Sequence, residues 1–224
     1  MTAADELVLD DLVLRTVCVG PMENQAYLLT CRRTGAQLLV DAAAEPDRLL
    51  ELVRTGSPGR LDLVVTTHRH ADHLGALAAM LAATGAPHAA GAADAHAVAA
   101  AAGTTTPRAL RHGDVLAVGD LRLEVIALRG HTPGAIALAY REPGVSRHEG
   151  AVAGRVHLLT GDSLFPGGPG RTTSPADFTS LMDDLEQRVF ARFGDDTCVH
   201  PGHGRGTTLG AERPSLGVWR SRGW

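Results

Sequence analysis

The sequence predicts an α+β protein in which helices cover two central β-sheets. Short apolar runs rich in β-branched residues, which are typical of strands, fall into two groups along the chain. Helical patterns interrupt both groups, so the expected packing places the sheets together and the helices outside. The 224 residues, 44% of them hydrophobic, suffice for one large domain, and neither repeats nor a low-complexity linker divide residues 1–224.

The first half of the chain opens with three expected strands and then alternates helices with strands. Turn sequences such as Gly20-Pro21 separate the strands, and apolar residues at helical spacing mark the helices. Gly56 and Gly85 are stop signals for two of the helices. The sequence predicts strands over 12–19, 26–31, 37–41 and 61–66, a short strand after residue 87, and helices over 45–55, 72–84 and 94–102.

The second half continues the alternation with a longer set of strands. A polar, glycine-rich stretch over 142–154 predicts a hairpin loop between two of them. Ser174 and Pro175 provide an N-cap and a first helical residue for a long helix. The expected strands begin near 115 and continue with 121–128, 135–141, 155–160 and 197–200, and the expected helix covers 175–190.

Four metal-capable side chains are concentrated in a short loop after the 61–66 strand. They follow the pattern His-x-His-x-Asp-His, and they are His68, His70, Asp72 and His73. Imidazole and carboxylate are ligands for zinc, manganese and iron, so this density indicates a metal site. The alternative is a polar loop with an aspartate helix cap and solvated histidines, which the pattern disfavours.

Three later strand ends supply further polar side chains. His131 stands in a turn of glycine and proline, Asp162 follows the next apolar run, and His203 follows the last one. Each alone could be an ordinary turn residue. Their common place at the carboxyl ends of strands indicates that they join the first four in one site. Asp41, which ends the third strand, either orients a ligand histidine or simply ends the strand.

Composition excludes several classes of function. All 21 basic residues are arginine, so neither a lysine Schiff base nor a P-loop lysine is available. A net charge of −4 without a basic cluster argues against nucleic acid as a partner. Residues 1–7 show no signal-peptide pattern and no apolar run has the length of a membrane span. We therefore expect a cytoplasmic protein with a small-molecule substrate and no membrane partner, while the oligomeric state stays open.

With this pattern the chain resembles the metallo-β-lactamase-fold hydrolases. The similarity includes all of their usual metal-binding elements in order, and it extends from Asn24 and Tyr27 to Thr207-Thr208. The resemblance implies a four-layer αββα sandwich with two metal ions at the edges of the sheets. It also implies the ligands: His68, His70 and His131 for one metal, Asp72, His73 and His203 for the other, and Asp162 as a bridge.

The chemistry of such a centre is hydrolysis. Two divalent metal ions, expected to be zinc with iron or manganese as alternatives, would share a bridging hydroxide that attacks at neutral pH. The metals would also polarise the substrate carbonyl and stabilise the tetrahedral oxyanion. Asp72 is the expected catalytic residue, which orients the hydroxide and relays its proton.

Within this superfamily the chain resembles the glyoxalase II-like thioester hydrolases, that is, hydroxyacylglutathione hydrolases. The similar segments are Gly130–Gly134, the region from Gly161 to Thr172, and Pro201–Gly204. Two features depart from that branch. Ala135 stands where many relatives have His or Ser, and only 21 residues follow His203 in the sequence, so we do not expect the helical domain that binds glutathione in the larger enzymes. A thioester of another thiol is therefore an open alternative.

Other classes remain as alternatives. Persulfide dioxygenases, which use a single iron, are similar around Gly170-Arg171-Thr172 and are the main one. Flavodiiron proteins have glutamate where His70 stands, and true β-lactamases commonly have cysteine where Asp162 stands, so both are disfavoured. A non-enzymatic protein with structural metals is also less favoured, because structural zinc sites are usually closed and rich in thiolates.

Overall fold

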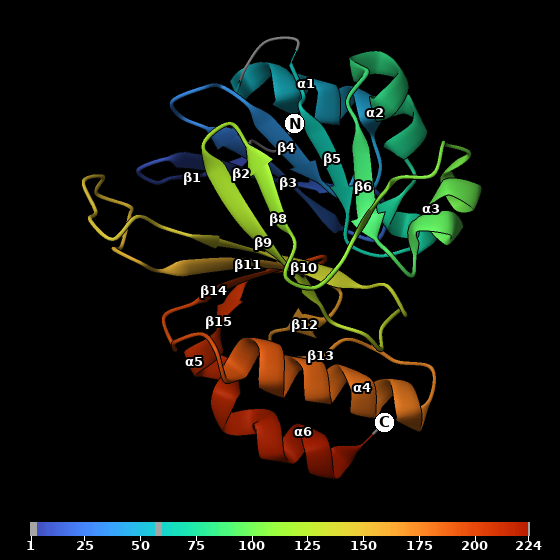
Figure 1. Cartoon of the computed structure of the whole chain (residues 1–224), viewed down its shortest axis with the longest axis vertical. Helices are drawn as coiled ribbons and strands as arrows, with labels where there is room; N and C mark the ends of the chain where they lie inside the picture. The colour runs from blue at the N-terminus through green and yellow to red at the C-terminus, as the bar shows by residue number, and fades with distance from the viewer. Residues whose placement is uncertain (1–3, 57–59, 224) are drawn as a thin grey trace.

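The computed structural model describes residues 4–56 and 60–223, and it shows two β-sheets packed face to face (Figure 1). Three helices cover the outer face of the first sheet: α1 (Pro46–Gly56), α2 (Leu77–Thr84) and α3 (Ala95–Ala102). Three more lie on the outer side of the second sheet: α4 (Pro175–Leu185), α5 (Leu209–Glu212) and, farther from the strands than α4, α6 (Leu216–Arg222). The expected α+β class and four-layer αββα sandwich are confirmed.

The first sheet contains seven strands in the order of the sequence. Hairpins join the first four strands antiparallel, and the helices α1, α2 and α3 connect the last four strands parallel. The strands are β1 (Asp5–Val8), β2 (Leu12–Val19), β3 (Asn24–Cys31), β4 (Gln37–Val40), β5 (Leu63–Thr66), β6 (His88–Gly91) and β7 (Arg108–Leu110).

The second sheet contains six strands in the order β15-β14-β11-β10-β9-β8. Only β11 and β14 pair in parallel among the described strands of this sheet, because α4 lies between them in the chain. The strands are β8 (Val115–Val118), β9 (Leu121–Ala127), β10 (Ile136–Arg141), β11 (Val156–Gly161), β14 (Cys198–Pro201) and β15 (Thr207–Thr208). A separate small hairpin consists of β12 (Leu164–Phe165) and β13 (Gly168–Pro169).

Alternation along the strands produces one apolar layer between the sheets and one under each set of helices. Leu29 and Leu38 of the first sheet meet Leu138 of the second in the central layer. Leu28 faces the other way, toward α1 and α2, and Leu158 faces α4. Because central strands such as β4 and β11 bury both faces, their positions are strongly specified, and their ends are rigid supports for loops.

The two sheets are hydrogen-bonded to each other at one edge. The Ile136 N–H of β10 donates to Thr67 O at 3.0 Å, and the Gln25 N–H of β3 donates to Gly202 O at 2.7 Å. Thr67 and Gly202 each lie next to a histidine predicted to bind metal. The loops that follow strands of different sheets therefore meet at this edge.

Several elements differ from the sequence-based expectation. β1 was not expected because Asp5 and Glu6 are charged, which suits its exposed place at the edge of the sheet. β7 and the helices α5 and α6 were also missed. Asp72 and His73 lie on a short 3-10 turn over 71–73, and α2 begins only at Leu77, so they do not open that helix. The helix expected over 175–190 ends as α4 at Leu185 and continues as a π-helix (Glu186–Phe190).

The three cysteines are free thiols, and they differ in burial: Cys31 is buried. Cys18 is exposed, because Val17 and Val19 occupy the buried positions on either side of it in β2. Cys198 is partly buried. None of the helices within residues 4–56 and 60–223 has the length and hydropathy that a membrane span requires. Residues 1–3 of the N-terminal segment lie outside the described residues.

We predict that Leu138→Ala lowers the free energy of unfolding by about 2–5 kcal/mol, because it leaves a cavity between the two sheets. The measurement is urea denaturation with a metal chelator present, so that metal binding does not contribute. Val218→Ala on the exposed side of α6 is the control, with an expected change within about 0.5 kcal/mol. Equal effects of the two substitutions would contradict the central layer as a main source of stability.

Candidate metal centre

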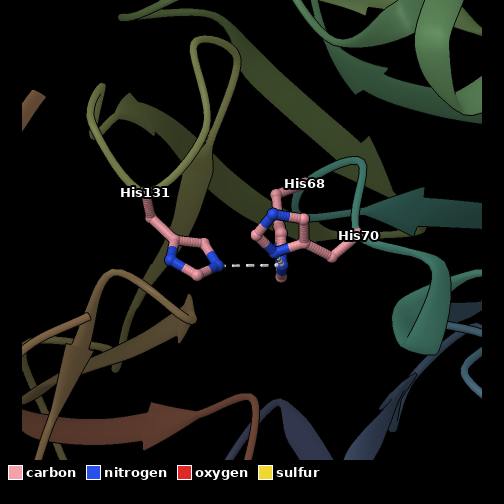
Figure 2. A group of neighbouring side chains, drawn as sticks. All are labelled: His68, His70 and His131. Atoms are coloured by element: carbon pink, nitrogen blue, oxygen red, sulfur yellow. Dashed lines mark hydrogen bonds between the residues drawn. The ribbon is translucent and has the colours of Figure 1, made fainter. Parts of the chain in front are cut away.

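Three histidines from both sheets form the first group at the shared edge (Figure 2). His68 Nε2 lies 3.1 Å from His70 Nδ1 and 3.3 Å from His131 Nε2. His68 and His70 come from the loop after β5, whereas His131 comes from the loop after β9. The ring nitrogens therefore converge on one point from loops of two different sheets.

A second group lies beside the first. His203 Nε2 is 3.2 Å from Asp72 Oδ2 and 3.3 Å from His73 Nε2. Asp72 and His73 belong to the 3-10 turn after β5, and His203 follows β14. This group likewise combines one loop of each sheet.

Asp162 lies between the two groups. Its Oδ2 is 3.7 Å from His131 Nε2 and 3.4 Å from His203 Nε2, and its Oδ1 is 3.4 Å from His73 Nε2. The carboxylate thus faces both groups at once. The structure brings together all seven residues that the sequence predicted, in three overlapping sets: His68, His70 and His131; His68, His73 and Asp162; and Asp72, His73 and His203.

Backbone carbonyls fix the orientation of two of these imidazoles. His131 Nδ1 lies 2.6 Å from Arg171 O, and His203 Nδ1 lies 2.9 Å from Met22 O. A carbonyl only accepts, so each Nδ1 carries the proton and donates it. In the neutral form of each imidazole, Nε2 is then unprotonated and presents its lone pair to the centre of the cluster.

Asp41 holds two further imidazoles. Its buried carboxylate accepts hydrogen bonds from Thr67 N–H at 2.7 Å, from Thr67 Oγ1 at 2.7 Å, and from His73 Nδ1 at 2.9 Å. The Thr67 hydroxyl in turn lies 3.0 Å from His68 Nδ1. Asp41 has a φ of 60°, a strained backbone conformation of the kind that is retained at functional sites. Of the two interpretations of Asp41, the orientation of a ligand histidine is confirmed.

Two residues that the family resemblance singled out also support the second group. Asn24 Nδ2 donates to Asp72 Oδ2 at 2.8 Å, which fixes the rotamer of that carboxylate. The Tyr27 hydroxyl donates to Pro201 O at 2.6 Å and so ties β3 to the end of β14. Gly202 completes this support, because a Cβ there would lie 2.1 Å from Asp162 Oδ1. Only glycine leaves room for the Asp162 carboxylate.

Charges inside the cluster are strongly coupled. Burial opposes ionisation of Asp162, but the interactions with the His203 and His73 imidazoles outweigh it and lower the pKa of Asp162. Burial also disfavours a charged His73, but Asp41 and Asp162 overcome it and raise the pKa of His73 to about 10. These carboxylates favour any positive charge at His73 Nε2, whether a proton or a metal ion.

In the first group, unlike at His73, the pKa values of two histidines are lowered. Burial, together with the neighbouring His73 and His131, lowers the pKa of His68 well below its usual value. Burial and His131 also lower the pKa of His70. Both imidazoles are therefore neutral at physiological pH, which is the form that binds a metal ion.

The side chains present fit a metal centre. Asp162 Oδ1 is buried and accepts no hydrogen bond from any described residue, although such an oxygen is costly to leave without a partner. The donor set of imidazole nitrogens and carboxylate oxygens, without a thiolate, suits zinc, iron or manganese. The His and Asp groups are thus able to bind metal and are consistent with a dimetal site.

The remaining histidines lie outside this cluster. His88 and His157 are buried with hydrogen-bond partners, Thr66 for the first and Glu142 and His200 for the second. His96, His112 and His148 are exposed or half-buried.

Sequence reasoning missed one residue next to the site. Asp94 is fully buried and accepts hydrogen bonds from both loops of the first group. Its only signal in the sequence is an aspartate at the start of an expected helix, which normally indicates a helix cap. Nothing in that signal points to the ligand loops.

A model of the metallo-beta-lactamase superfamily matches residues 19–203 of the chain. The chain belongs to this superfamily. The matched range begins in β2 and ends at His203, so it contains all seven residues of the candidate centre.

Individual relatives add detail. Hydroxyacylglutathione hydrolase of Polaromonas sp. (strain JS666 / ATCC BAA-500) is 33% identical over 181 residues, which are 80% of this chain and 62% of that protein. The chain thus spans less than two thirds of that relative's length. The family and the relatives of this name support a metallo-hydrolase enzyme.

Two crystal structures are similar over most of the chain. The structure of TTHA1623 in a di-iron-bound form has 33% identity and a TM-score of 0.62, and the match covers 88% of this chain and 96% of that one. The structure of ETHE1 from Myxococcus xanthus has 28% identity and a TM-score of 0.70, and the match covers 89% and 81%.

We predict that the purified protein, saturated with zinc and dialysed, retains two metal ions per chain. The reason is that two candidate ligand groups lie on either side of the Asp162 carboxylate. Elemental analysis by mass spectrometry measures the ratio, and Asp162→Ala is expected to retain at most one ion. A ratio of one or less in the parent protein under zinc, iron and manganese alike would contradict a dinuclear centre.

Proposed function

We propose that the protein is a thioester hydrolase similar to glyoxalase II, with two metal ions, preferentially zinc, at the candidate centre. The observation that carries this proposal is the complete pair of ligand groups with Asp162 between them. His68, His70 and His131 would hold one ion, Asp72, His73 and His203 the other, and Asp162 both. The relatives named hydroxyacylglutathione hydrolase support the choice of a thioester.

Bound metals would lower the pKa of a water molecule and polarise the carbonyl of the substrate. The protein's own contribution is orientation. Asp41 and the carbonyls of Arg171 and Met22 hold the imidazoles in their unprotonated-Nε2 form toward the cluster.

Asp72 is the catalytic residue in this proposal. Its Oδ2 accepts a hydrogen bond from Asn24, and its side chain is 21% exposed, so it can reach solvent. A carboxylate held in this way can orient a water molecule and take its proton. The thiolate of a thioester is a good leaving group, so the reaction does not depend on a strong general acid.

A pocket of about 490 Å³ adjoins the first group and offers a place for the substrate. Its wall includes Gly170 and Arg171, and the Arg171 carbonyl is the group that His131 contacts. Thr173, Phe178 and Arg222 complete much of the lining. We propose that this pocket receives part of the thioester, while the scissile carbonyl lies over the cluster.

We also propose that residues 1–224 act as one cytoplasmic domain on a small molecule, without a nucleic-acid or membrane partner. Support for one domain comes from the site itself, since each ligand group needs loops of both sheets. A net charge of −4 supports the absence of nucleic acid.

A persulfide dioxygenase with a single iron is the second candidate. The likeness to ETHE1 and the segment Gly170-Arg171-Thr172 favour it. The hydrolase is preferred because Asp72, His73 and His203 form a complete second group.

We expect Asp72→Asn to lower kcat for a thioester by at least about 100-fold, because the amide cannot take a proton. The first ligand group does not include Asp72, so it should still retain one metal ion. Steady-state kinetics and metal analysis on the same preparation test this. Asp47→Asn, at an exposed position of α1, is the matched control and should leave kcat unchanged. If the kcat of Asp72→Asn stays within a few-fold of the parent value, Asp72 is not part of the catalytic machinery.

We expect hydrolysis of small thioesters such as S-lactoyl or acetoacetyl derivatives, and we expect it to continue without dioxygen. The assay follows release of thiol under nitrogen with zinc-loaded protein. In parallel, iron-loaded protein is given a low-molecular-weight persulfide in air. Oxygen uptake and sulfite release without any thioester turnover would show that the second candidate is correct.

A further inference from the structure

We propose that Asp94 is a positioning residue that holds the first ligand group in register by joining its two loops. The inference rests on the proposed metal centre but not on the choice of substrate. His68 and His70 follow β5, and His131 follows β9, so two loops far apart in the sequence must keep their imidazoles within hydrogen-bonding distance. Asp94 contacts both loops directly.

Three hydrogen bonds make this connection. Asp94 Oδ2 accepts from Arg69 N–H at 3.2 Å, at the residue between the two ligand histidines of the first loop. The same oxygen accepts from Thr132 Oγ1 at 2.5 Å, and Oδ1 accepts from Gly134 N–H at 3.0 Å. Thr132 immediately follows His131. One carboxylate therefore fixes the backbone beside all three imidazoles of the group.

Asp94 is not used as a helix cap, although it directly precedes α3. Its side chain accepts no hydrogen bond from the first turn of that helix, whereas Ser174 accepts from Asp177 N–H at the start of α4. The carboxylate of Asp94 is completely buried, and its nearest cation is Arg69 Nε at 3.8 Å. Such a charge is costly unless it is well hydrogen-bonded, so the bonds to the two loops are what stabilise it.

Glycines allow the loops to approach Asp94 this closely. A Cβ on Gly134 would lie 2.3 Å from the Asp94 backbone nitrogen, and a Cβ on Gly91 would lie 1.9 Å from Gly134 O. These contacts are with rigid backbone, so a side chain at either position would push the His131 loop away. The glycine that ends Thr132-Pro133-Gly134 is thus explained by the packing of this loop on Asp94.

The second ligand group has different supports. Asp72 is held by Asn24, His73 by Asp41, and His203 by the Met22 carbonyl. Among the hydrogen bonds of the described residues, none joins Asp94 to any of these three side chains. Loss of the Asp94 carboxylate should therefore weaken the first metal position selectively.

The test is Asp94→Asn, which has the same shape but replaces one acceptor oxygen by an amide donor. In one orientation the amide N–H group faces the Arg69 N–H, and in the other it faces the Gly134 N–H, so one backbone donor loses its acceptor in either case. Zinc affinity is measured by competition with a chromogenic chelator in two backgrounds. His203→Ala removes a residue of the second group, so the zinc affinity of this variant measures binding to the first group. His131→Ala removes a residue of the first group, so its zinc affinity measures binding to the second. In the His203→Ala background we expect Asp94→Asn to weaken zinc binding about 10–100-fold, as loss of a ligand-orienting partner does. In the His131→Ala background we expect no change.

Two further variants keep the result interpretable if Asp94→Asn does not fold. Thr132→Val removes one of the three donors to Asp94 without changing the shape of the side chain. In the His203→Ala background we expect it to lower zinc affinity less than Asp94→Asn does. Asp62→Asn is the matched control, because Asp62 also accepts a backbone N–H, from Gln37, but lies at the opposite end of β5.

Each outcome decides between the possibilities. Selective weakening of the first position by Asp94→Asn or Thr132→Val supports the inference. Unchanged zinc affinity, or equal losses at both positions with a lower melting temperature by circular dichroism, overturns the positioning role and leaves only a structural one. A parent protein that binds no zinc would instead overturn the metal centre itself, which separates the two failures.

Discussion

The whole arrangement depends on the burial of the Asp162 carboxylate between imidazoles of both sheets. A buried carboxylate is costly, and the cost is offset only when positive or hydrogen-bonding groups surround it. Here the neighbouring groups are the imidazoles of His73, His131 and His203, which come from three different loops and could share a metal ion with the carboxylate. Each loop must therefore end at the same edge, which requires the two sheets to be joined there by backbone hydrogen bonds. The charge balance of the cluster therefore depends on the sandwich architecture, which brings the three loops to one edge.

Residues outside the cluster determine how well it is organised. Asp41, at the end of β4, links the two histidines of the β5 loop, and Asp94, at the start of α3, links that loop to the one after β9. Both are buried acids whose hydrogen bonds are fully committed to the ligand loops. Mobile surface loops alone could not hold ring nitrogens about 3 Å apart, so the precision comes from these supports and from the rigid strand ends.

The sequence predicted the seven residues of the cluster because each follows an apolar run, and a polar residue at a strand end is visible as a change in pattern. It also predicted most strands and helices for the same reason. It could not rank the interpretations of Asp41, because orientation of His73 depends on which strands are neighbours. Asp94 was missed because an aspartate before a helix has the same local pattern whether it caps the helix or reaches across to another loop. β1 was missed because its charged residues are typical of an exposed edge and not of a strand.

The two halves of the candidate centre differ in how they are supported. Each contains one buried and two partly exposed residues, but the first is held by completely buried Asp94, whereas Asp72 and His203 of the second are held by Asn24 and by the Met22 carbonyl of the β2–β3 turn. That turn includes Met22, which is 59% exposed, and Glu23, which has a φ of 56°. The second group therefore depends on the segment from Met22 to Asn24, whereas the first group depends on Asp94.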